Sequence, residues 1–264
     1  MPDVPHPNPP ASTHVGATPL LLVAASGLAR EVLALLRTPR PATSQVQRYE
    51  VIGALDDSPA LAGRDIDGVP VLGGLDAVQS YPDAAVLACA GQGRVRESMV
   101  ARLAVLGVSV DRYASVVHPG VEVPPACTLG PGCIVLAGVV LTAAVTVGRH
   151  VVLMPHVTLT HDDTVDDFAT LCAGVTLGGG VTVGRAAYLG MNASVREHVH
   201  VGVGATLGMG AVLLNDLPAR QIWVGNPARP LVAPPSDERE IAPPAAAPRL
   251  SSARRVAKGM GGAS

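Results

Sequence analysis

Aliphatic residues recur at every sixth position over the second half of the chain. Cut into blocks of six from Ser115, the sequence has Leu or Val at the third place of seventeen consecutive blocks, from Val117 to Leu213. Burial every 3.6 residues, as in a helix, or every second residue, as in a strand, cannot give this period. A period of six indicates a short extended segment followed by a turn. Three such segments form a coil, and coils stack by parallel strand pairing, so the pattern predicts a parallel β-helix over 113–231.

Small residues follow the same period. Glycine often stands directly after the inward aliphatic residue, and we expect these glycines at corners where φ is positive. They are Gly130, Gly148, Gly178, Gly184, Gly190, Gly202 and Gly208. A right-handed parallel β-helix is the main structural alternative, although its coils are usually longer and less regular.

The region 20–112 alternates apolar runs with segments of helical spacing. Strands are expected at Leu20–Ala24, Glu50–Leu55 and Ala85–Ala90, and helices at Leu28–Arg37 and Val95–Leu106. This order predicts a small parallel sheet.

Ligands bind at the carboxyl ends of strands in such sheets. The three predicted strand ends carry Ser26-Gly27, Asp56-Asp57 and Gly91, and a helix beginning at Gly27 suits a phosphate. An ordinary turn or solvated loop explains each feature alone, but their shared edge favours a binding site.

The two ends of the chain have a different character. Residues 1–19 are Pro-rich without apolar periodicity, and 232–264 are rich in Pro, Ala and Ser, so both are expected to be disordered. The apolar run at Leu20–Ala25 is too short for a secretory signal, and no run is long enough to span a membrane.

Composition removes several classes of function. The net charge of −2 and the 2% of aromatic residues give no reason to expect binding of nucleic acid or of an acidic membrane surface. The four cysteines form no CxxC pair, which argues against a zinc site. They are expected to be small buried residues in a reducing compartment, which favours a cytoplasmic location.

His161-Asp162 is the candidate for chemistry. An imidazole titrates near neutrality and can accept a proton, and an adjacent carboxylate stabilises the imidazolium. Gly179 lies 18 residues further on, one coil away and about 5 Å from His161, where its N–H could stabilise an oxyanion. The alternative is a surface histidine. A metal held by His156 and His161 is disfavoured, because a five-residue spacing sends them toward different faces.

Four motifs together resemble the hexapeptide-repeat acyltransferases, and within them the sialic-acid O-acetyltransferase-like family with its bacterial nucleotide-amino-sugar N-acetyltransferases. Residues 161–168 (HDDTVDDF) are similar to H-[DE]-C-x-I-G-[DE]-F, and 225–229 (GNPAR) to the closing G-x-P-A-[KR]. Residues 68–73 (GVPVLG) resemble the family's middle segment. Residues 24–29 (AASGLA) resemble G-A-S-G-H-G with Ala24, Leu28 and Ala29 in place of two glycines and the histidine.

The resemblance implies a left-handed β-helix, acetyl-CoA as co-substrate without a metal, and a homotrimer with sites between prisms. It implies His161 as general base, Asp162 as the acid that raises its basicity, and Gly179 as oxyanion donor. Cofactor contacts would come from Met191, Asn192, Gly208 and Met209, and from Thr170, which stands where the family often has histidine. Nucleotide-sugar contacts would come from Ser26, Gly27, Leu28, Asp56, Asp57 and Gly91. Two departures, Asp163 for Cys and Asp166 for Gly, should add negative charge that favours the imidazolium.

The sequence therefore predicts an α/β part that binds a nucleotide sugar, followed by a β-helix that transfers an acetyl or other short acyl group to an amine or hydroxyl of that sugar. A non-catalytic scaffold or sugar-binding trimer, and an acyltransferase with a non-sugar acceptor, remain as alternatives.

Overall fold

The computed structural model describes residues 17–39 and 49–231. The predicted tail at 232–264 and residues 1–16 of the predicted leader lie outside the described residues. The first strand begins at Thr18, so Thr18 and Pro19, assigned to the leader from the sequence, belong to the sheet.

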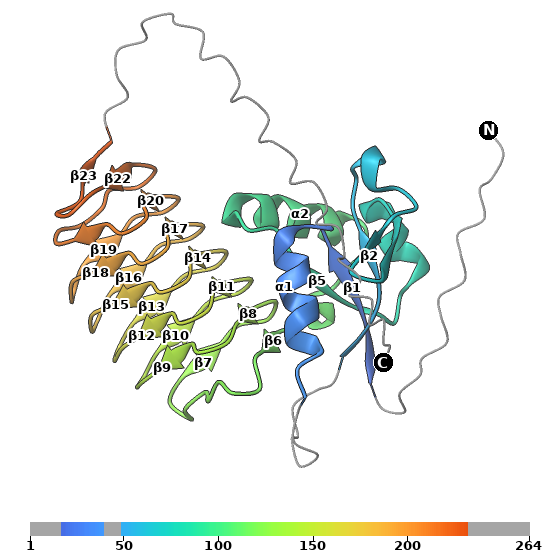
Figure 1. The fold of residues 1–264 in the computed structure, drawn as a ribbon, viewed down its shortest axis with the longest axis horizontal. Coiled ribbons are helices and arrows are strands. Elements are labelled where there is room, and N and C mark those ends of the chain that lie inside the picture. Colours follow the sequence, from blue (N-terminus) through green and yellow to red (C-terminus); the bar gives the residue numbers. More distant parts are fainter. Residues whose placement is uncertain (1–16, 40–48, 232–264) are drawn as a thin grey trace, which may run out of the picture. The chain divides into compact units, whose positions relative to one another are not determined.

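The α/β part contains every strand and helix that the apolar runs predicted, together with short elements that they did not (Figure 1). In chain order these are β1 (Thr18–Val23), α1 (Gly27–Leu36), β2 (Tyr49–Leu55), the 3-10 helix η1 (Pro59–Leu61), β3 (Asp65–Ile66), β4 (Val69–Gly73), η2 (Leu75–Ser80), β5 (Ala85–Ala88), α2 (Gly93–Val105) and η3 (Val110–Arg112). The β3–β4 hairpin was missed because β3 has only two residues and carries no periodicity.

The five strands form one sheet in the order β3-β4-β2-β1-β5, parallel except for the β3–β4 pair. The central strand β1 alternates its side chains between two cores. Leu20 and Leu22 pack with α1, whereas Leu21 and Val23 pack with η2 and α2. The two helices therefore cover opposite faces, as expected for a buried parallel sheet.

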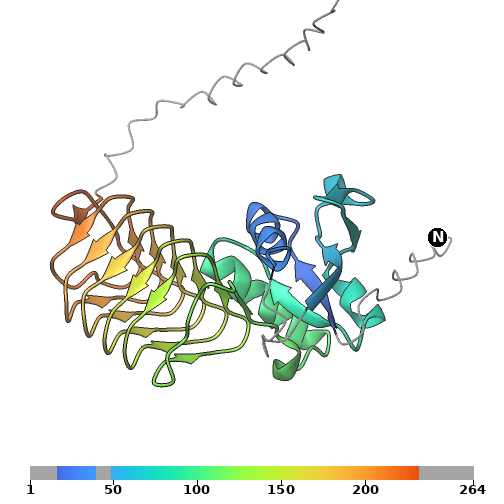
Figure 2. The same cartoon turned by 60° about the horizontal axis from the view of Figure 1, so that its bottom comes forward.

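The second half forms three sheets of very short strands, parallel except for the β22–β23 pair (Figures 1 and 2). The first face holds β6 (Val116–Val117), β8 (Ile134–Val135), β11 (Val152–Leu153), β14 (Thr170–Leu171), β17 (Tyr188–Leu189), β20 (Thr206–Leu207), β22 (Ile222–Val224) and β23 (Arg229–Pro230). The second face holds β9 (Val140–Leu141), β12 (Thr158–Leu159), β15 (Thr176–Leu177), β18 (Ser194–Val195) and β21 (Val212–Leu213). The third face holds β7 (Thr128–Leu129), β10 (Thr146–Val147), β13 (Thr164–Val165), β16 (Thr182–Val183) and β19 (His200–Val201).

The predicted fold class, an α/β part followed by a β-helix of hexapeptide repeats, is thus confirmed. Every block forms a strand except the second, where Val123 lies in a loop and is 39% exposed. The interior contains aliphatic residues from the first and third places of the blocks, with only Trp223 packed against it as an aromatic side chain among the described residues. A narrow prism explains a chain rich in aliphatic residues and poor in aromatic ones.

The corner glycines need a correction. Positive φ occurs at every sixth residue from Gly132 to Gly210, and these positions also include alanine, histidine, aspartate, asparagine and Phe168. The glycines directly after the inward residue have no positive φ. They are required because a Cβ would collide with the next coil: at Gly178 it would lie 2.6 Å from the Glu197 nitrogen. Close approach of backbones, not a left-handed turn, explains this column.

Candidate active site

The carboxyl ends of β1, β2 and β5 bring the predicted sugar-binding residues to one edge. Asp56 accepts a hydrogen bond from the Ala25 N–H at 2.8 Å, and the Ser26 hydroxyl donates to the Cys89 carbonyl. Ser26 also caps α1 by accepting from the N–H groups of Leu28 and Ala29 at 3.1 and 3.3 Å. The predicted edge therefore forms, with the loops after the three strands tied to one another.

Two of the predicted residues are placed differently within that edge. Leu28 is buried, so only its backbone faces the edge. Asp57 turns toward other elements, where it accepts from the Leu75 N–H at 3.0 Å and pairs with Arg102 of α2. The Arg102 hydrogen bond is the main cause that lowers the pKa of the Asp57 carboxyl.

Gly91, the third strand end, is joined to the β-helix by a buried polar cluster. Its carbonyl accepts from the Thr170 hydroxyl at 2.8 Å and from Arg96 at 3.0 Å. The Arg96 guanidinium also donates to the carbonyls of Ala90, His150, Phe168 and Ala169 and to Thr170 Oγ1. Arg96 is fully buried, and burial lowers its pKa to about 10, so it stays charged at neutral pH. We call Arg96, His150 and Thr170 the junction.

The junction changes the interpretation of Thr170. Its side chain is 2% exposed and its hydroxyl is engaged with Gly91 and Arg96. It is therefore not open to a cofactor in this chain, unlike the other residues predicted to contact acetyl-CoA.

His161 and Asp162 lie at the corner between the second and third faces. His161 Nδ1 is 2.8 Å from Asp162 Oδ2, and the two side chains are 64% and 68% exposed. Asp162 occupies one of the positive-φ places (φ 64°), a conformation that aspartate adopts more readily than most residues. This turn brings the carboxylate back onto the ring and leaves Nε2 on the other side of the imidazole.

Gly179 lies in the next coil under the His161 ring. A Cβ on Gly179 would lie 2.4 Å from His161 Nε2, so only glycine leaves room for the ring in this position. The flanking N–H groups of Gly178 and Gly180 donate to Val195 and His161 carbonyls, whereas the Gly179 N–H has no partner in the described part of the chain. A buried free N–H is unusual and is available to an oxygen of a ligand.

The remaining predicted cofactor residues lie at the corner between the first and second faces. Met191 and Met209 are one coil apart and are 48% and 70% exposed. Asn192 is also exposed, and Gly208 approaches Val224 so closely that a Cβ would lie 2.6 Å from its methyl group. Together they form an exposed strip along that corner.

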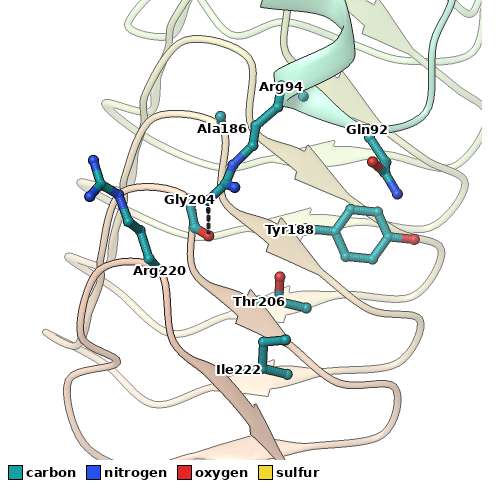
Figure 3. A pocket seen from close by; sticks show the side chains of 9 residues that line it. Gln92, Arg94, Ala186, Tyr188, Gly204, Thr206, Arg220 and Ile222 are labelled. Carbon is teal, nitrogen blue, oxygen red and sulfur yellow. Dashed lines mark hydrogen bonds between the residues drawn. The ribbon is translucent and has the colours of Figure 1, made fainter.

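A cavity of about 450 Å³ lies on the first face, toward its corner with the third face (Figure 3). Figure 3 shows Tyr188, Thr206 and Ile222 in a row on successive strands, while Arg94 of α2 reaches over and donates to the Gly204 carbonyl at 3.2 Å. The lining is completed by Gln92, Gly93, Ala186 and Arg220. A hydrogen bond with Cys172 raises the pKa of Tyr188 to about 12, so the phenol stays neutral.

Sequence reasoning missed this cavity. The signal was present, because Tyr188 and Thr206 stand 18 and 36 residues after Thr170 and therefore share its outward column. The contribution of α2 had no signal, since nothing in the local pattern says which face of the prism the helix covers.

The described residues contain no group of three or more His, Cys, Asp or Glu side chains that could hold a metal ion. All four cysteines are free and buried, as predicted. No helix among residues 17–39 and 49–231 has the length and apolar character needed to cross a membrane.

No protein-family model and no curated protein matches this sequence. Solved structures do match. PerB from Caulobacter crescentus, in complex with CoA and GDP-perosamine, is 28% identical and has a TM-score of 0.71 over 83% of this chain and 99% of its own. Perosamine N-acetyltransferase from the same organism, with one histidine replaced by asparagine and the same two ligands, is 26% identical with a TM-score of 0.73 over 84% and 100%.

A protein from another organism is similar over the same part of the chain. The acetyltransferase domain of PglB from Neisseria gonorrhoeae, in complex with acetyl coenzyme A, is 28% identical and has a TM-score of 0.70 over 82% of this chain and 100% of its own. The resemblance predicted from the motifs is therefore confirmed: over most of its length the chain matches the hexapeptide-repeat β-helix N-acetyltransferases represented by PerB and PglB.

Proposed function

We propose that this protein transfers an acetyl group from acetyl-CoA to an amino group of a nucleotide-linked sugar. The observation that carries the proposal is the His161–Asp162 pair standing over the free N–H of Gly179. The similar structures support it, since PerB was determined with CoA and GDP-perosamine, and the PglB domain with acetyl coenzyme A. Hydroxyl acceptors and other short acyl groups fit the same chemistry, and the assay below separates amine from hydroxyl acceptors.

His161 acts as the general base. Its Nδ1 is occupied by Asp162 at 2.8 Å, which orients the ring and leaves Nε2 to take a proton from the sugar amine. As the proton leaves, the amine nitrogen attacks the thioester carbonyl carbon. The new C–N bond forms, the C–S bond breaks, and CoA departs as a thiolate that recovers a proton.

Gly179 supports the charge that develops in this step. Its N–H lies in the coil next to His161 and is free, so it can donate to the thioester oxygen as that oxygen becomes negative. Loss of one such donor typically costs about 10²–10³ in rate. A direct transfer needs no acyl-enzyme intermediate, and none of the four buried cysteines enters the reaction.

A complete site requires a second copy of the chain. The first face carries the α/β part, through Gly91, Thr170 and the junction. His161 lies at the corner between the other two faces, which is opposite the first face in a triangular prism. One chain therefore cannot bring its sugar-binding edge to its own His161. We infer a homotrimer in which His161 of one subunit meets the first face of its neighbour, where its exposed imidazole becomes shielded from water.

The acetyl-CoA arm would lie along the first face of that neighbour. The strip of Met191 and Met209 offers apolar contact at one edge of this face, and the cavity of about 450 Å³ on the same face has the size of a ligand site. Arg94 and Arg220 add positive charge near its edge, which suits the phosphates of CoA.

The test is a thiol-release assay with acetyl-CoA and a panel of nucleotide amino-sugars, nucleotide sugars with hydroxyls only, and free amino-sugars. Wild-type protein should turn over one of the nucleotide amino-sugars. His161→Ala should lower kcat about 10²–10⁴-fold, the usual contribution of a general base. His156→Ala is the matched control, because His156 is also exposed at a corner, and it should keep full activity.

Full turnover by His161→Ala would remove the catalytic assignment. If wild-type protein releases no thiol with any acceptor but binds a nucleotide sugar, the scaffold alternative is favoured. If turnover appears only when the panel is extended to a non-sugar amine, the acceptor is replaced and the chemistry stays intact.

A further inference from the structure

One buried carboxylate interrupts the aliphatic interior of the β-helix. From Cys127 to Ala211 all blocks but one have Cys, Val or Ala at their first place, and all of these side chains belong to the interior. At Asp163 that place is occupied by a carboxylate with no exposed surface. A buried carboxylate is costly unless hydrogen bonds compensate it, so its presence needs a reason. It stands two residues after His161.

The carboxylate joins two coils. Its Oδ2 accepts from the Thr160 N–H at 2.7 Å and its Oδ1 accepts from the Val181 N–H at 2.9 Å. Thr160 and Asp163 flank the His161–Asp162 pair, and Val181 follows Gly179 by two residues. Asp163 therefore holds the turn that carries the base and the turn that carries the oxyanion donor with one side chain.

The regular ladder is broken at this point. In the corresponding place of other coils, Thr142, Gly178 and Arg196 donate their N–H groups to Leu159, Val195 and Leu213 carbonyls at 2.9–3.1 Å. The Thr160 N–H goes to Asp163 instead, and the Leu177 carbonyl accepts from the Thr160 hydroxyl at 3.1 Å. The register reflects the change, since β12 and β15 pair only at Thr158 and Thr176.

From these contacts we infer that Asp163 is a positioning residue: by replacing a ladder hydrogen bond with its carboxylate, it sets the distance between the His161 ring and the Gly179 N–H. The expected effect on turnover rests on the proposed function. The link between the two turns rests only on the broken ladder of hydrogen bonds. Valine at 163 would match Val145, Val181 and Val199 in the same column and would let the Thr160 N–H return to the Leu177 carbonyl. The turn carrying His161 would then shift relative to Gly179.

The state of the carboxyl agrees with this role. Burial raises the pKa of Asp163 to about 6, while the hydrogen bonds from Val181 and Thr160 act in the opposite direction. The charged groups that face it are His161 and Asp162 of the same turn. Above about pH 6 the ionised form accepts both N–H groups.

The experiment compares Asp163→Val and Asp163→Asn with wild-type protein by steady-state kinetics and by amide hydrogen exchange. Asp163→Val should keep or raise the melting temperature, lower kcat about 10–100-fold and change KM for acetyl-CoA less than about threefold, because a small misplacement of a catalytic group acts on rate. The amide of Asp163→Asn has one acceptor oxygen and can accept only one of the two N–H groups. Its kcat should therefore lie between those of wild-type protein and Asp163→Val. Val145→Ala, in the same column one coil earlier, should lower the melting temperature and leave kcat unchanged.

Exchange provides a readout that needs no substrate. The Val181 amide should exchange at least tenfold faster in Asp163→Val than in wild-type protein or Val145→Ala. A kcat within twofold of wild type, or unchanged exchange at Val181, overturns the positioning role. If wild-type protein shows no acetyl transfer, the proposed function fails, while exchange at Val181 still decides whether Asp163 holds the two turns together.

Discussion

Arg96 and Asp163 are both charged and fully buried, and within the described part of the chain no oppositely charged side chain touches either, yet they act on different parts of the molecule. Arg96 donates to carbonyls of the α/β part and of the β-helix, so its charge joins two structures with separate cores. Asp163 accepts from two coils of one structure, beside the candidate base. A buried polar group can therefore serve assembly at one place and site geometry at another, and measurements of stability and of turnover should separate the two roles.

The largest effect is expected at the junction. Arg96→Met keeps the length of the side chain but removes a donor from five carbonyls and the Thr170 hydroxyl. The Gly91 and Ala169 carbonyls keep hydrogen bonds from Thr170 and Val152, so those of Ala90, His150 and Phe168 lose the most. We expect a loss of about 3–5 kcal/mol in the free energy of unfolding, because each unsatisfied buried group costs about 1–3 kcal/mol and some will relax. Urea denaturation followed by the fluorescence of the single Trp223 measures it.

Arg102→Met is the matched control for that measurement. Arg102 lies on the same helix α2, but its side chain is 55% exposed and its pair with Asp57 is open to solvent. Exposed pairs contribute about 0–1 kcal/mol. Equal losses for the two variants would show that the buried cluster does not join the α/β part to the β-helix.

The next effect is expected at the corner of His161. Gly179→Ala places a methyl group 2.3–2.4 Å from the ring atoms, so the ring must swing away while the backbone, which has no positive φ, tolerates alanine. We expect kcat to fall about 100-fold with the melting temperature nearly unchanged. Gly120→Ala, where the nearest atom lies at 3.5 Å, is the control. A large drop in the melting temperature of Gly179→Ala with unchanged kcat would show that Gly179, like Gly178, is needed only for close packing of the coils.

The smallest effect concerns pH and His150. Its ring packs edge-on against Tyr113 and stacks on Phe168, and its Nδ1 has no hydrogen-bond partner among the residues that the structure describes. Burial, followed by the charges of Arg96 and Arg149, lowers the pKa of His150 to about 4. The unfolded chain, with a pKa near 6.5, binds the proton first as pH falls. The stability due to neutral His150 is therefore complete above about pH 6.5 and decreases toward pH 4.

The expected size is about 2 kcal/mol between pH 7 and pH 5, measured as the difference between wild-type protein and His150→Phe. Phenylalanine fits the same positive-φ place, as Phe168 shows, and cannot titrate. His156→Phe, at an exposed corner place, should leave the pH dependence as in wild type. Asp163 acts in the opposite direction over a similar range, because its raised pKa makes burial less costly as pH falls, so the difference between variants is needed to isolate His150.

Much of this molecule could be predicted without coordinates. The six-residue period locates every β-helix strand from β7 to β21, and the 18-residue coil by itself places Gly179 beside His161. The strand ends at Ser26, Asp56 and Gly91 met at one edge because parallel strands leave no other arrangement. These results depend on repetition and on order along the chain, both of which are visible in a sequence.

Other features depended on contacts between segments far apart in sequence. Nothing in the pattern said that α2 would lie on the first face, so neither the burial of Thr170 under Arg96 nor the cavity beside Arg94 could be foreseen. Asp163 was expected to add charge near His161, but its side chain is buried and binds backbone.

The sequence by itself determined the period, and with it the prism, its aliphatic interior and the column in which each side chain lies. The tertiary structure decided what each exception to the period does. A periodic pattern reports only the average surroundings of a position, whereas a buried charge at Arg96 or Asp163 is stable because of particular carbonyls and N–H groups. Those partners come from other coils and another sheet, and only folding brings them within hydrogen-bond distance.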